Sequence, residues 1–130
     1  MTHSKSFDIA MLILRVTFGG LMLINHGWGK LLRFFEDPSD FGDPIGLGAP
    51  VSFALTVFAE VICAGLLAIG LFTRYAAVPL IITMLVAAFI VHADDPFSKI
   101  EKALMFLMAY IAIGFAGPGW YSVDAQLKKI

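Results

Sequence analysis

Charged side chains are scarce in this sequence. Of its 130 residues, 15% are Asp, Glu, Lys or Arg, against roughly a quarter in an average soluble domain. Hydrophobic residues make up 59%, and the mean hydropathy is +0.86. A chain of this length does not need so much apolar side chain for one water-facing core, because small domains bury only part of their surface. The composition excludes a disordered chain and argues against a soluble globular one, so the lipid bilayer is the expected solvent.

Three further absences limit the function. The net charge is −1, so the positive surface that nucleic-acid binding requires is missing and no nucleic-acid partner is expected. Cys63 is the single cysteine, which excludes an intrachain disulfide and a Cys-x-x-Cys redox pair. No His-x-x-x-His or His-Glu-x-x-His spacing occurs, so no metal-binding motif is present.

The sequence does contain four long apolar segments. We expect helices over about residues 9–32, 51–72, 75–93 and 101–116, within one membrane domain covering residues 1–130. Helices of about 19–22 residues extend about 28–33 Å, which matches the roughly 30 Å hydrocarbon core of a bilayer. No segment alternates apolar and polar residues with period two, as the strands of a membrane barrel would. The predicted fold class is therefore all-α, a bundle of four transmembrane helices.

The first segment is expected to remain as a helix and not to be removed as a signal peptide. Its apolar run is followed by NHGWGK at residues 25–30, and not by the small residues of a cleavage site. Four spans place both termini on one side of the membrane. With Arg15 set aside, Lys and Arg are divided four against four between the two sides, whereas acidic residues gather on the loop side. On this acidic asymmetry we expect both termini in the cytoplasm.

Two ionisable residues lie well inside the predicted spans, away from the helix ends. Arg15 is one and a half to two turns into the first helix, and Glu60 is near the middle of the second. Charges inside a membrane are costly and mark functional or paired positions. In an antiparallel arrangement an extended arginine closes much of the difference in depth, so we expect a buried Arg15–Glu60 ion pair. Such a pair could serve packing alone, and the alternative is that Arg15 reaches the near surface and leaves Glu60 protonated.

A second group of polar residues is predicted at the loop-side membrane surface. His26 lies about 27 Å along the first helix and His92 about 26 Å along the third, so both reach nearly the same depth. Glu101 begins the fourth helix on that side, and Lys30 shares the helix face of His26. We expect these four side chains to converge, with two more nearby: Trp28 and Asn25.

These residue types suggest a chemistry. Imidazole titrates near neutrality, binds carbonyl groups and relays protons, so histidines with a carboxylate suit quinone binding with coupled proton transfer. The candidate catalytic residues are His26, His92 and Glu101, and the candidate ligand-binding residues are Lys30, Trp28 and Asn25. Two histidines and a glutamate could equally hold a metal ion. The simplest alternative is that the histidines are hydrated at the level of the lipid headgroups.

Short motifs spread over nearly the whole chain carry a family resemblance. They are LRV at residues 14–16, NHGWGKL at 25–31, EVICAG at 60–65, GLFTRYAA at 70–77, VH at 91–92 and GPGWYSVD at 117–124. In these motifs the sequence resembles the DoxX family of small bacterial membrane proteins. The characteristic positions of the family fall on seven residues here: Arg15, His26, Lys30, Glu60, Arg74, His92 and Glu101.

The resemblance implies a four-helix protein of the bacterial inner membrane. Relatives in this family include a membrane subunit linked to thiosulfate–quinone oxidoreduction and members tied to thiol or oxidative-stress responses. The redox members work with partner subunits. The resemblance implies no catalytic residue that is common to the family.

The leading hypothesis is a redox-associated membrane subunit that engages a quinone, or another apolar ligand, near the loop-side surface. His26 and His92 would bind the ligand or move protons, and Glu101 would orient them. Because the sequence has no electron-carrying cofactor motif, electrons would come from a partner protein or a soluble donor. The expected partners are membrane lipid, a quinone, and a partner protein or a second copy of the chain. Two alternatives are a non-catalytic adaptor or structural subunit of a larger complex, and a small transporter with Arg15 and Glu60 in its polar path.

Overall fold

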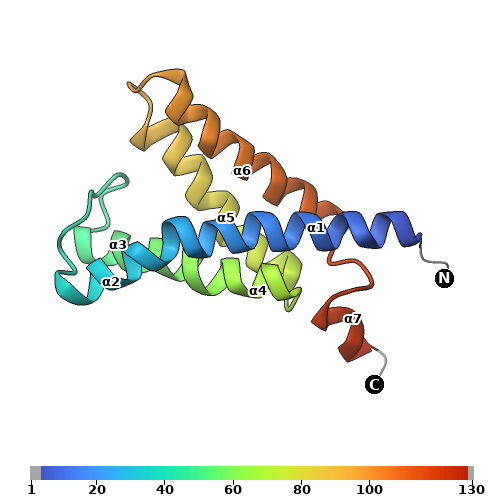
Figure 1. Ribbon diagram of the computed structural model, residues 1–130. Coiled ribbons are helices and arrows are strands. Elements are labelled where there is room, and N and C mark those ends of the chain that lie inside the picture. Colours follow the sequence, from blue (N-terminus) through green and yellow to red (C-terminus); the bar gives the residue numbers. More distant parts are fainter. Residues whose placement is uncertain (1–3, 129–130) are drawn as a thin grey trace.

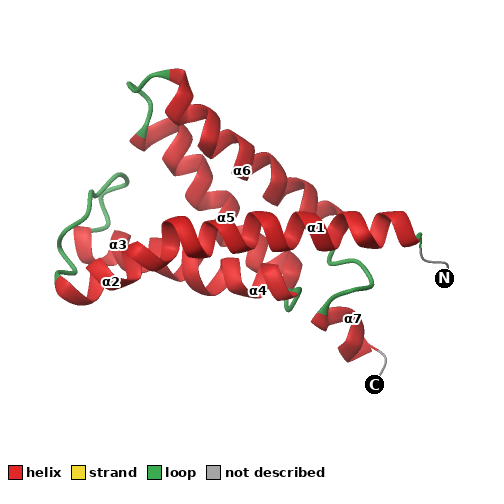
Figure 2. Ribbon diagram, in the orientation of Figure 1, coloured by secondary structure: helices red, strands yellow, loops and turns green. Residues whose placement is uncertain are grey.

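Four helical spans and a short C-terminal helix make up the computed structural model, which describes residues 4–128. The first span comprises α1 (Lys5–Met22), η1 (Leu23–Gly27) and α2 (Trp28–Glu36), and the second comprises α3 (Ala49–Val57), η2 (Phe58–Cys63) and α4 (Ala64–Ile69). The third span is α5 (Thr73–Val86) with η3 (Ala87–Val91), the fourth is α6 (Phe97–Ala116), and α7 (Val123–Lys128) follows (Figure 1, Figure 2).

The helices have the length and composition of membrane spans. Three of them are long and apolar enough to cross a bilayer: Lys5–Glu36, Ala49–Ile69 and Thr73–Val91. The fourth, α6, has 20 residues and carries its charges within its first two turns. Between residues 4 and 128 every regular element is a helix. The predicted fold class, an all-α bundle of four transmembrane helices, is confirmed.

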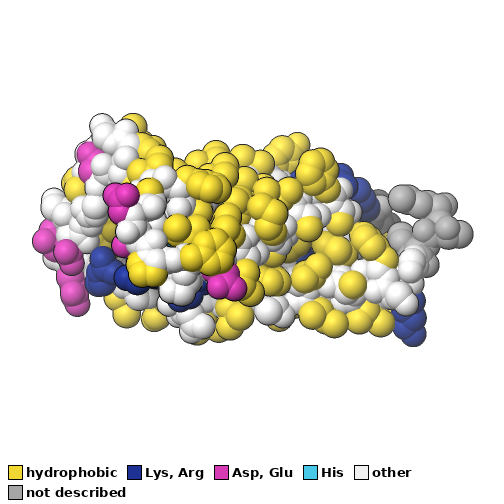
Figure 3. Space-filling model, turned by 90° about the horizontal axis from the view of Figure 1, so that it is seen from above, with side chains coloured by type: hydrophobic (Ala, Val, Ile, Leu, Met, Phe, Trp, Pro, Cys, Tyr) yellow, Lys and Arg dark blue, Asp and Glu magenta, His cyan; other side chains and the backbone are white. Residues whose placement is uncertain are grey.

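Apolar side chains cover much of the outside of the bundle. Ile24, Tyr75 and Phe115 are 69%, 79% and 84% exposed, which suits side chains that face lipid. Figure 3 shows hydrophobic side chains along most of one face, with the acidic side chains gathered toward the end that holds the α2–α3 loop. We call this end of the bundle the loop side.

The helices differ at their ends from the predicted ranges. The first span begins at Lys5, where the Ser4 side chain accepts a hydrogen bond from the Phe7 N–H at 3.3 Å, and it continues to Glu36. It is thus longer at both ends than the predicted 9–32. The short helix α7 was not predicted at all, because tertiary contacts at the closed end of the bundle hold it.

Three of the four spans contain a π-helical segment. This wider winding covers five residues in η1, six in η2 and five in η3. A π-helical turn contains an additional residue, so it moves the following side chains to a different face of the helix. The segments η1 and η2 pack against each other, and η2 packs against α5.

Two glycines determine how the first span crosses the second. A Cβ atom on Gly19 would lie 2.7 Å from the carbonyl oxygen of Ala64, and a Cβ atom on Gly27 would collide with the carbonyl group of Glu60. Because only glycine allows so close an approach of two helix backbones, these positions set the register of the two spans. Gly27 lies level with Glu60, and Gly19 lies level with Ala64 and Ala68.

The bundle is closed at the end near the chain termini and splayed at the loop side. The hairpin of α5 and α6 packs against the first two spans near the termini and diverges from them toward the α2–α3 loop (Figure 1). The buried core is apolar and includes Met11, Leu67, Leu80, Leu107 and Ile113. The splayed end leaves room between the spans for the cavities described below.

Asp124 fastens the C-terminal segment to the start of α5. Its carboxylate accepts hydrogen bonds from the N–H groups of Phe72 (2.8 Å) and Thr73 (3.0 Å) and from the Thr73 hydroxyl (2.9 Å). Its own N–H donates to the carbonyl of Gly70, which adopts a left-handed φ of 78° and ends α4. Partial burial raises the pKa of Asp124, but the hydrogen bonds from Thr73 and Phe72 outweigh this effect and hold the pKa below its ordinary value.

Candidate functional site

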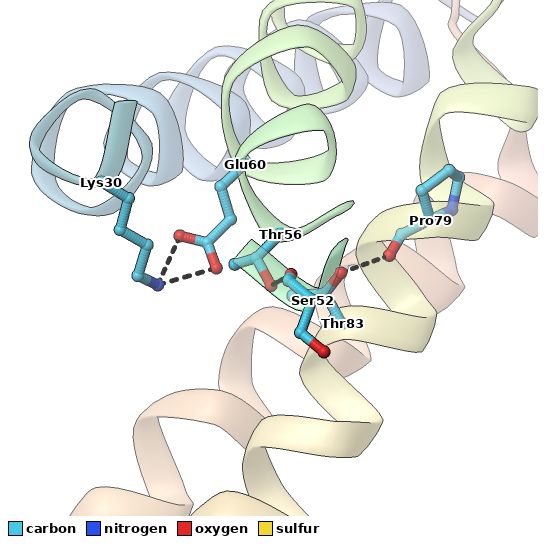
Figure 4. A network of polar contacts seen from close by, with 6 residues as sticks. All are labelled: Lys30, Ser52, Thr56, Glu60, Pro79 and Thr83. Atoms are coloured by element: carbon cyan, nitrogen blue, oxygen red, sulfur yellow. Dashed lines mark hydrogen bonds and ion pairs between the residues drawn. The ribbon is translucent and has the colours of Figure 1, made fainter. Parts of the chain in front are cut away.

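An ion pair between Lys30 and Glu60 lies at the centre of the candidate site. The Lys30 ammonium donates hydrogen bonds to both carboxylate oxygens of Glu60, at 2.7 Å and 2.9 Å (Figure 4). The side chain of Glu60 is 3% exposed and that of Lys30 is 26% exposed. Lys30 comes from α2 and Glu60 from η2, so the pair joins the first two spans toward the loop side.

The predicted Arg15–Glu60 ion pair does not form. Arg15 is fully buried, and its Nη1 and Nη2 atoms donate hydrogen bonds to the carbonyls of Ala68 (3.0 Å) and Tyr121 (2.5 Å). The glycine contacts explain the difference, because they set Glu60 level with Gly27 and leave Arg15 about three turns away along the first span. Arg15 therefore joins α1 to the end of α4 and to the C-terminal segment.

An apolar cavity of about 340 Å³ opens between the second and third spans, and we call it the cleft. Lys30 and Glu60 form its polar part, and Leu55, Ile82 and Val86 contribute to its apolar wall. Two threonines also line it: Thr56 donates to the carbonyl of Ser52 at 2.9 Å, and Thr83 donates to that of Pro79 at 2.8 Å (Figure 4). A carbonyl-bearing apolar ligand would find both an apolar surface and a hydrogen-bond donor here.

The α2–α3 loop covers part of the cleft. Phe41 from this loop lines the cleft and stacks on Phe53, with ring centroids 4.6 Å apart. The Asp43 carboxylate accepts hydrogen bonds from the Ser52 hydroxyl (2.9 Å) and from the Gly48 N–H (3.0 Å). The hydrogen bond from Ser52 is the main reason why the pKa of Asp43 lies below its ordinary value. The loop is thus attached to α3 at two points.

A second, smaller cavity of about 110 Å³ adjoins the cleft, and we call it the basic pocket. It lies between the first, third and fourth spans and shares the Lys30–Glu60 pair and His92 with the cleft. The remaining residues that line it are Met22, His26, Met84, Ala87, Lys99, Lys102, Ala103 and Phe106. The structure therefore brings His26, His92, Lys30 and Glu60 to one cavity.

The two histidines are held in different ways. The ring of His26 stands edge-on to that of Phe106, with centroids 5.8 Å apart. His92 donates from Nδ1 to the carboxylate of Asp95 at 2.7 Å. This hydrogen bond is the main cause of the lowered pKa of Asp95. Asp95, and not Glu101, is the carboxylate that orients a histidine here.

Three of the predicted site residues lie elsewhere. Glu101 is exposed and lines a different, apolar groove between α1 and α6, with Leu14 and Phe18. Successive residues of a helix are about 100° apart, so Glu101 points away when Lys102 faces the basic pocket. Asn25 and Trp28 are exposed on the outside of the first span. Among the described residues no three His, Cys, Asp or Glu side chains gather as a metal site would require.

Sequence reasoning missed two lysines and all three π-helical segments. Lys99 and Lys102 line the basic pocket together with Phe106. These three residues are spaced i, i+3, i+7, which places them on one helix face and was the sequence signal that could have found the lysines. His26 lies in η1, Glu60 lies in η2, and η3 ends directly before His92. The π-helical segments therefore surround the site, where such irregular turns are often found in proteins.

Comparison with known proteins agrees with this architecture. The DoxX family profile matches residues 10–93. An uncharacterized membrane protein of Mycobacterium tuberculosis is 33% identical over 129 residues, which cover 85% of this chain and 77% of the relative. An uncharacterized protein of Haemophilus influenzae is 27% identical over 108 residues, covering 79% of this chain and 72% of the relative. No solved structure matches the chain significantly. The chain belongs to the DoxX family of membrane proteins.

Proposed function

We propose that the cleft binds a quinone, or a similar apolar carbonyl compound, and that the protein is a membrane subunit of a redox system. The observation that carries this proposal is an apolar cavity that ends on a buried ion pair with an ammonium donor. A cavity of about 340 Å³ lies within the range of roughly 300–1,000 Å³ that small-molecule sites occupy.

The polar end of the cleft suits a carbonyl oxygen. An ammonium group has three N–H donors. The two carboxylate oxygens of Glu60 accept two hydrogen bonds from Lys30, which leaves Lys30 one further donor for a ligand. Leu55, Ile82 and Val86 would contact the ring and the first part of an isoprenoid tail. The rest of the tail would leave through the open side of the splayed bundle into lipid.

Reduction of a bound quinone to the quinol takes up two electrons and two protons. The electrons would come from a partner protein or a soluble reductant, since the proposal gives this chain the ligand and proton side of the reaction. His92 and His26 border the same ion pair from the basic pocket, so they are placed to supply protons from the loop-side surface. Glu101 has no part in this scheme.

The proposal includes a location and partners. We expect the bacterial inner membrane, with both termini in the cytoplasm and the site near the opposite surface. Membrane lipid would surround the apolar exterior, and the electron donor would be a soluble reductant or a partner protein that docks near the loop side. A second copy of the chain is the alternative protein partner. Fusion of a reporter enzyme to each terminus and to the α2–α3 loop would test this orientation.

Filling the cleft tests the proposal most directly. Val86 lines the cleft, whereas its neighbour Leu85 is 42% exposed and lines none of the cavities described here. Val86→Trp should abolish binding of a short-chain quinone to the detergent-purified protein and remove any co-purifying quinone, and Leu85→Trp should change neither. His26→Ala and His92→Ala should slow proton-coupled reduction while the quinone still binds.

Two results would contradict the proposal. One is equal quinone binding by wild type and Val86→Trp, provided that both variants retain the wild-type circular dichroism spectrum. The other is the absence of quinone binding by the wild-type protein at concentrations near those of membrane quinones. That second result, together with a stable complex with another membrane protein, would favour the non-catalytic adaptor.

A further inference from the structure

The basic pocket carries more positive charge than its surroundings neutralise. Lys30, Lys99 and Lys102 line it together with a single carboxylate, Glu60. Glu60 already pairs with Lys30, so the pocket lining has no further carboxylate to pair with Lys99 or Lys102. The net charge of its lining residues is +2 with the histidines neutral.

Acidic residues near the pocket are engaged elsewhere. Asp95 lies close enough to Lys99 to feel its charge, but the carboxylate accepts its hydrogen bond from His92. Glu101 lies along the groove between α1 and α6, on another side of the helix. Across residues 4–128 no hydrogen bond or ion pair reaches the side chain of Lys99 or Lys102. Two like charges three residues apart on one helix face repel each other, so a bound anion would stabilise this arrangement.

The donors in the pocket come from different directions. Lys99 and Lys102 approach from α6, Lys30 from α2 and His26 from η1, around one cavity. Lys99 and Lys102 also lie in the first two turns of the 20-residue α6, where the helix dipole favours a negative ligand. Several converging donors are what an oxyanion requires, because each oxygen accepts more than one hydrogen bond.

The size of the pocket limits the ligand to a small group. A volume of about 110 Å³ corresponds to roughly three or four water molecules in the liquid. This accommodates a phosphate-sized tetrahedral anion but no lipid chain. The pocket lies at the loop side, where lipid headgroups meet the protein, and basic pockets between transmembrane helices are known to bind such headgroups.

We propose that the basic pocket binds a phosphate-type oxyanion, held by Lys99, Lys102 and His26. The anion comes either from an anionic lipid headgroup or from a soluble phosphate-like ion. The basic pocket shares Lys30, Glu60 and His92 with the cleft. Anion binding by Lys99, Lys102 and His26 does not depend on the proposed function.

Calorimetric titration of the lipid-stripped protein in a neutral detergent tests the proposal at low salt. The three probes are inorganic phosphate, dihexanoyl phosphatidylglycerol and the zwitterionic dihexanoyl phosphatidylcholine. Binding of both anionic probes identifies a site for soluble anions, and binding of phosphatidylglycerol alone identifies a headgroup site. Phosphatidylcholine should bind at least about tenfold more weakly than phosphatidylglycerol, because its headgroup carries no net charge.

Matched lysine substitutions locate the binding. The double variant Lys99→Gln/Lys102→Gln should raise the Kd about 30-fold, or roughly fivefold for each exposed lysine. The control Lys5→Gln/Lys128→Gln removes the same charge at the opposite end and should leave the Kd within about twofold. Val86→Trp should also leave it unchanged, which separates this site from the cleft.

Three outcomes would overturn the proposal. They are the failure of both anionic probes to bind, equal binding of phosphatidylcholine and phosphatidylglycerol, and a double variant whose Kd stays within about twofold of wild type. Because Lys99 and Lys102 are exposed and their side chains make no hydrogen bond among the described residues, the double variant should fold normally. Far-UV circular dichroism and the unfolding midpoint would verify this.

Discussion

Removing Lys30 alone should destabilise the protein more than removing both members of the Lys30–Glu60 pair. Lys30→Met leaves the Glu60 carboxylate, which is 3% exposed, without the donor that now bonds both of its oxygens. Breaking a buried pair from one side costs about 3–5 kcal/mol. Because Lys30 itself is 26% exposed, we expect the lower end, about 3 kcal/mol.

The other two variants of this double-mutant cycle, Glu60→Met and the double variant, should lose less stability. Glu60→Met leaves an ammonium group that reaches water, so we expect a loss of about 1–2 kcal/mol. The double variant replaces the pair by apolar side chains of similar length, and such replacements are often nearly neutral, within about 1 kcal/mol. The coupling energy between Lys30 and Glu60 is then about 3–5 kcal/mol.

The free energy of unfolding can be measured by reversible denaturation with dodecyl sulfate in mixed micelles, followed by circular dichroism. Arg33→Met is the matched control, because the Arg33–Asp40 pair is long (3.9 Å) and its side chains are 49% and 67% exposed. That control should cost less than about 1 kcal/mol. A coupling energy below about 0.5 kcal/mol, or a Lys30→Met loss no greater than the Arg33→Met loss, would refute the reasoning.

Two further predictions use the same unfolding assay. Gly27→Ala should lower the free energy of unfolding by about 2–3 kcal/mol, because its Cβ atom would collide with the Glu60 carbonyl. The control Gly29→Ala, whose Cβ atom would have nothing within 4 Å, should be neutral or stabilising by up to about 1 kcal/mol. Equal losses of stability in the two variants would contradict the role of Gly27 in setting the helix register. Asp124→Asn should cost about 1–2 kcal/mol at neutral pH, because it weakens the cap on Thr73. Since the folded-state pKa of Asp124 is lowered, its contribution to stability is present above the unfolded pKa of about 3.9 and is lost as the pH falls through the folded pKa. A difference in stability between wild type and Asp124→Asn that stays constant from pH 7 to pH 3 would contradict this role.

The sequence predicted the depth of several residues of the candidate site but not their pairing. The depths of His26, His92 and Lys30 follow from counting residues along a helix, and the structure places all three on the basic pocket. Glu60 was recognised as a buried charge, yet it was paired with Arg15 in place of Lys30. Counting gives the depth of one residue in its own helix, whereas ion pairing depends on the register between two helices.

Some predictions of which side chains face the site were wrong, because the α-helical repeat of 3.6 residues per turn does not assign helix faces correctly in this chain. Three π-helical segments each shift the following side chains around the helix axis. The predicted position of Glu101 was wrong for a simpler reason. The predicted start of its helix did not specify which helix face meets the bundle. Asp95 lies in the loop between the third and fourth spans, where helix periodicity gives no signal, and it contacts His92.

The scarcity of charge and the four apolar segments were sufficient by themselves to determine a membrane bundle, because segment length and hydropathy measure the free energy of transfer into lipid. Those quantities depend on each segment alone. The tertiary structure alone decided that Lys30 reaches Glu60, that Arg15 caps the carbonyls of the closed end, and that two free lysines face a pocket. These contacts depend on how closely Gly19 and Gly27 let two backbones approach and on where the helices widen, and both are properties of helix pairs in space.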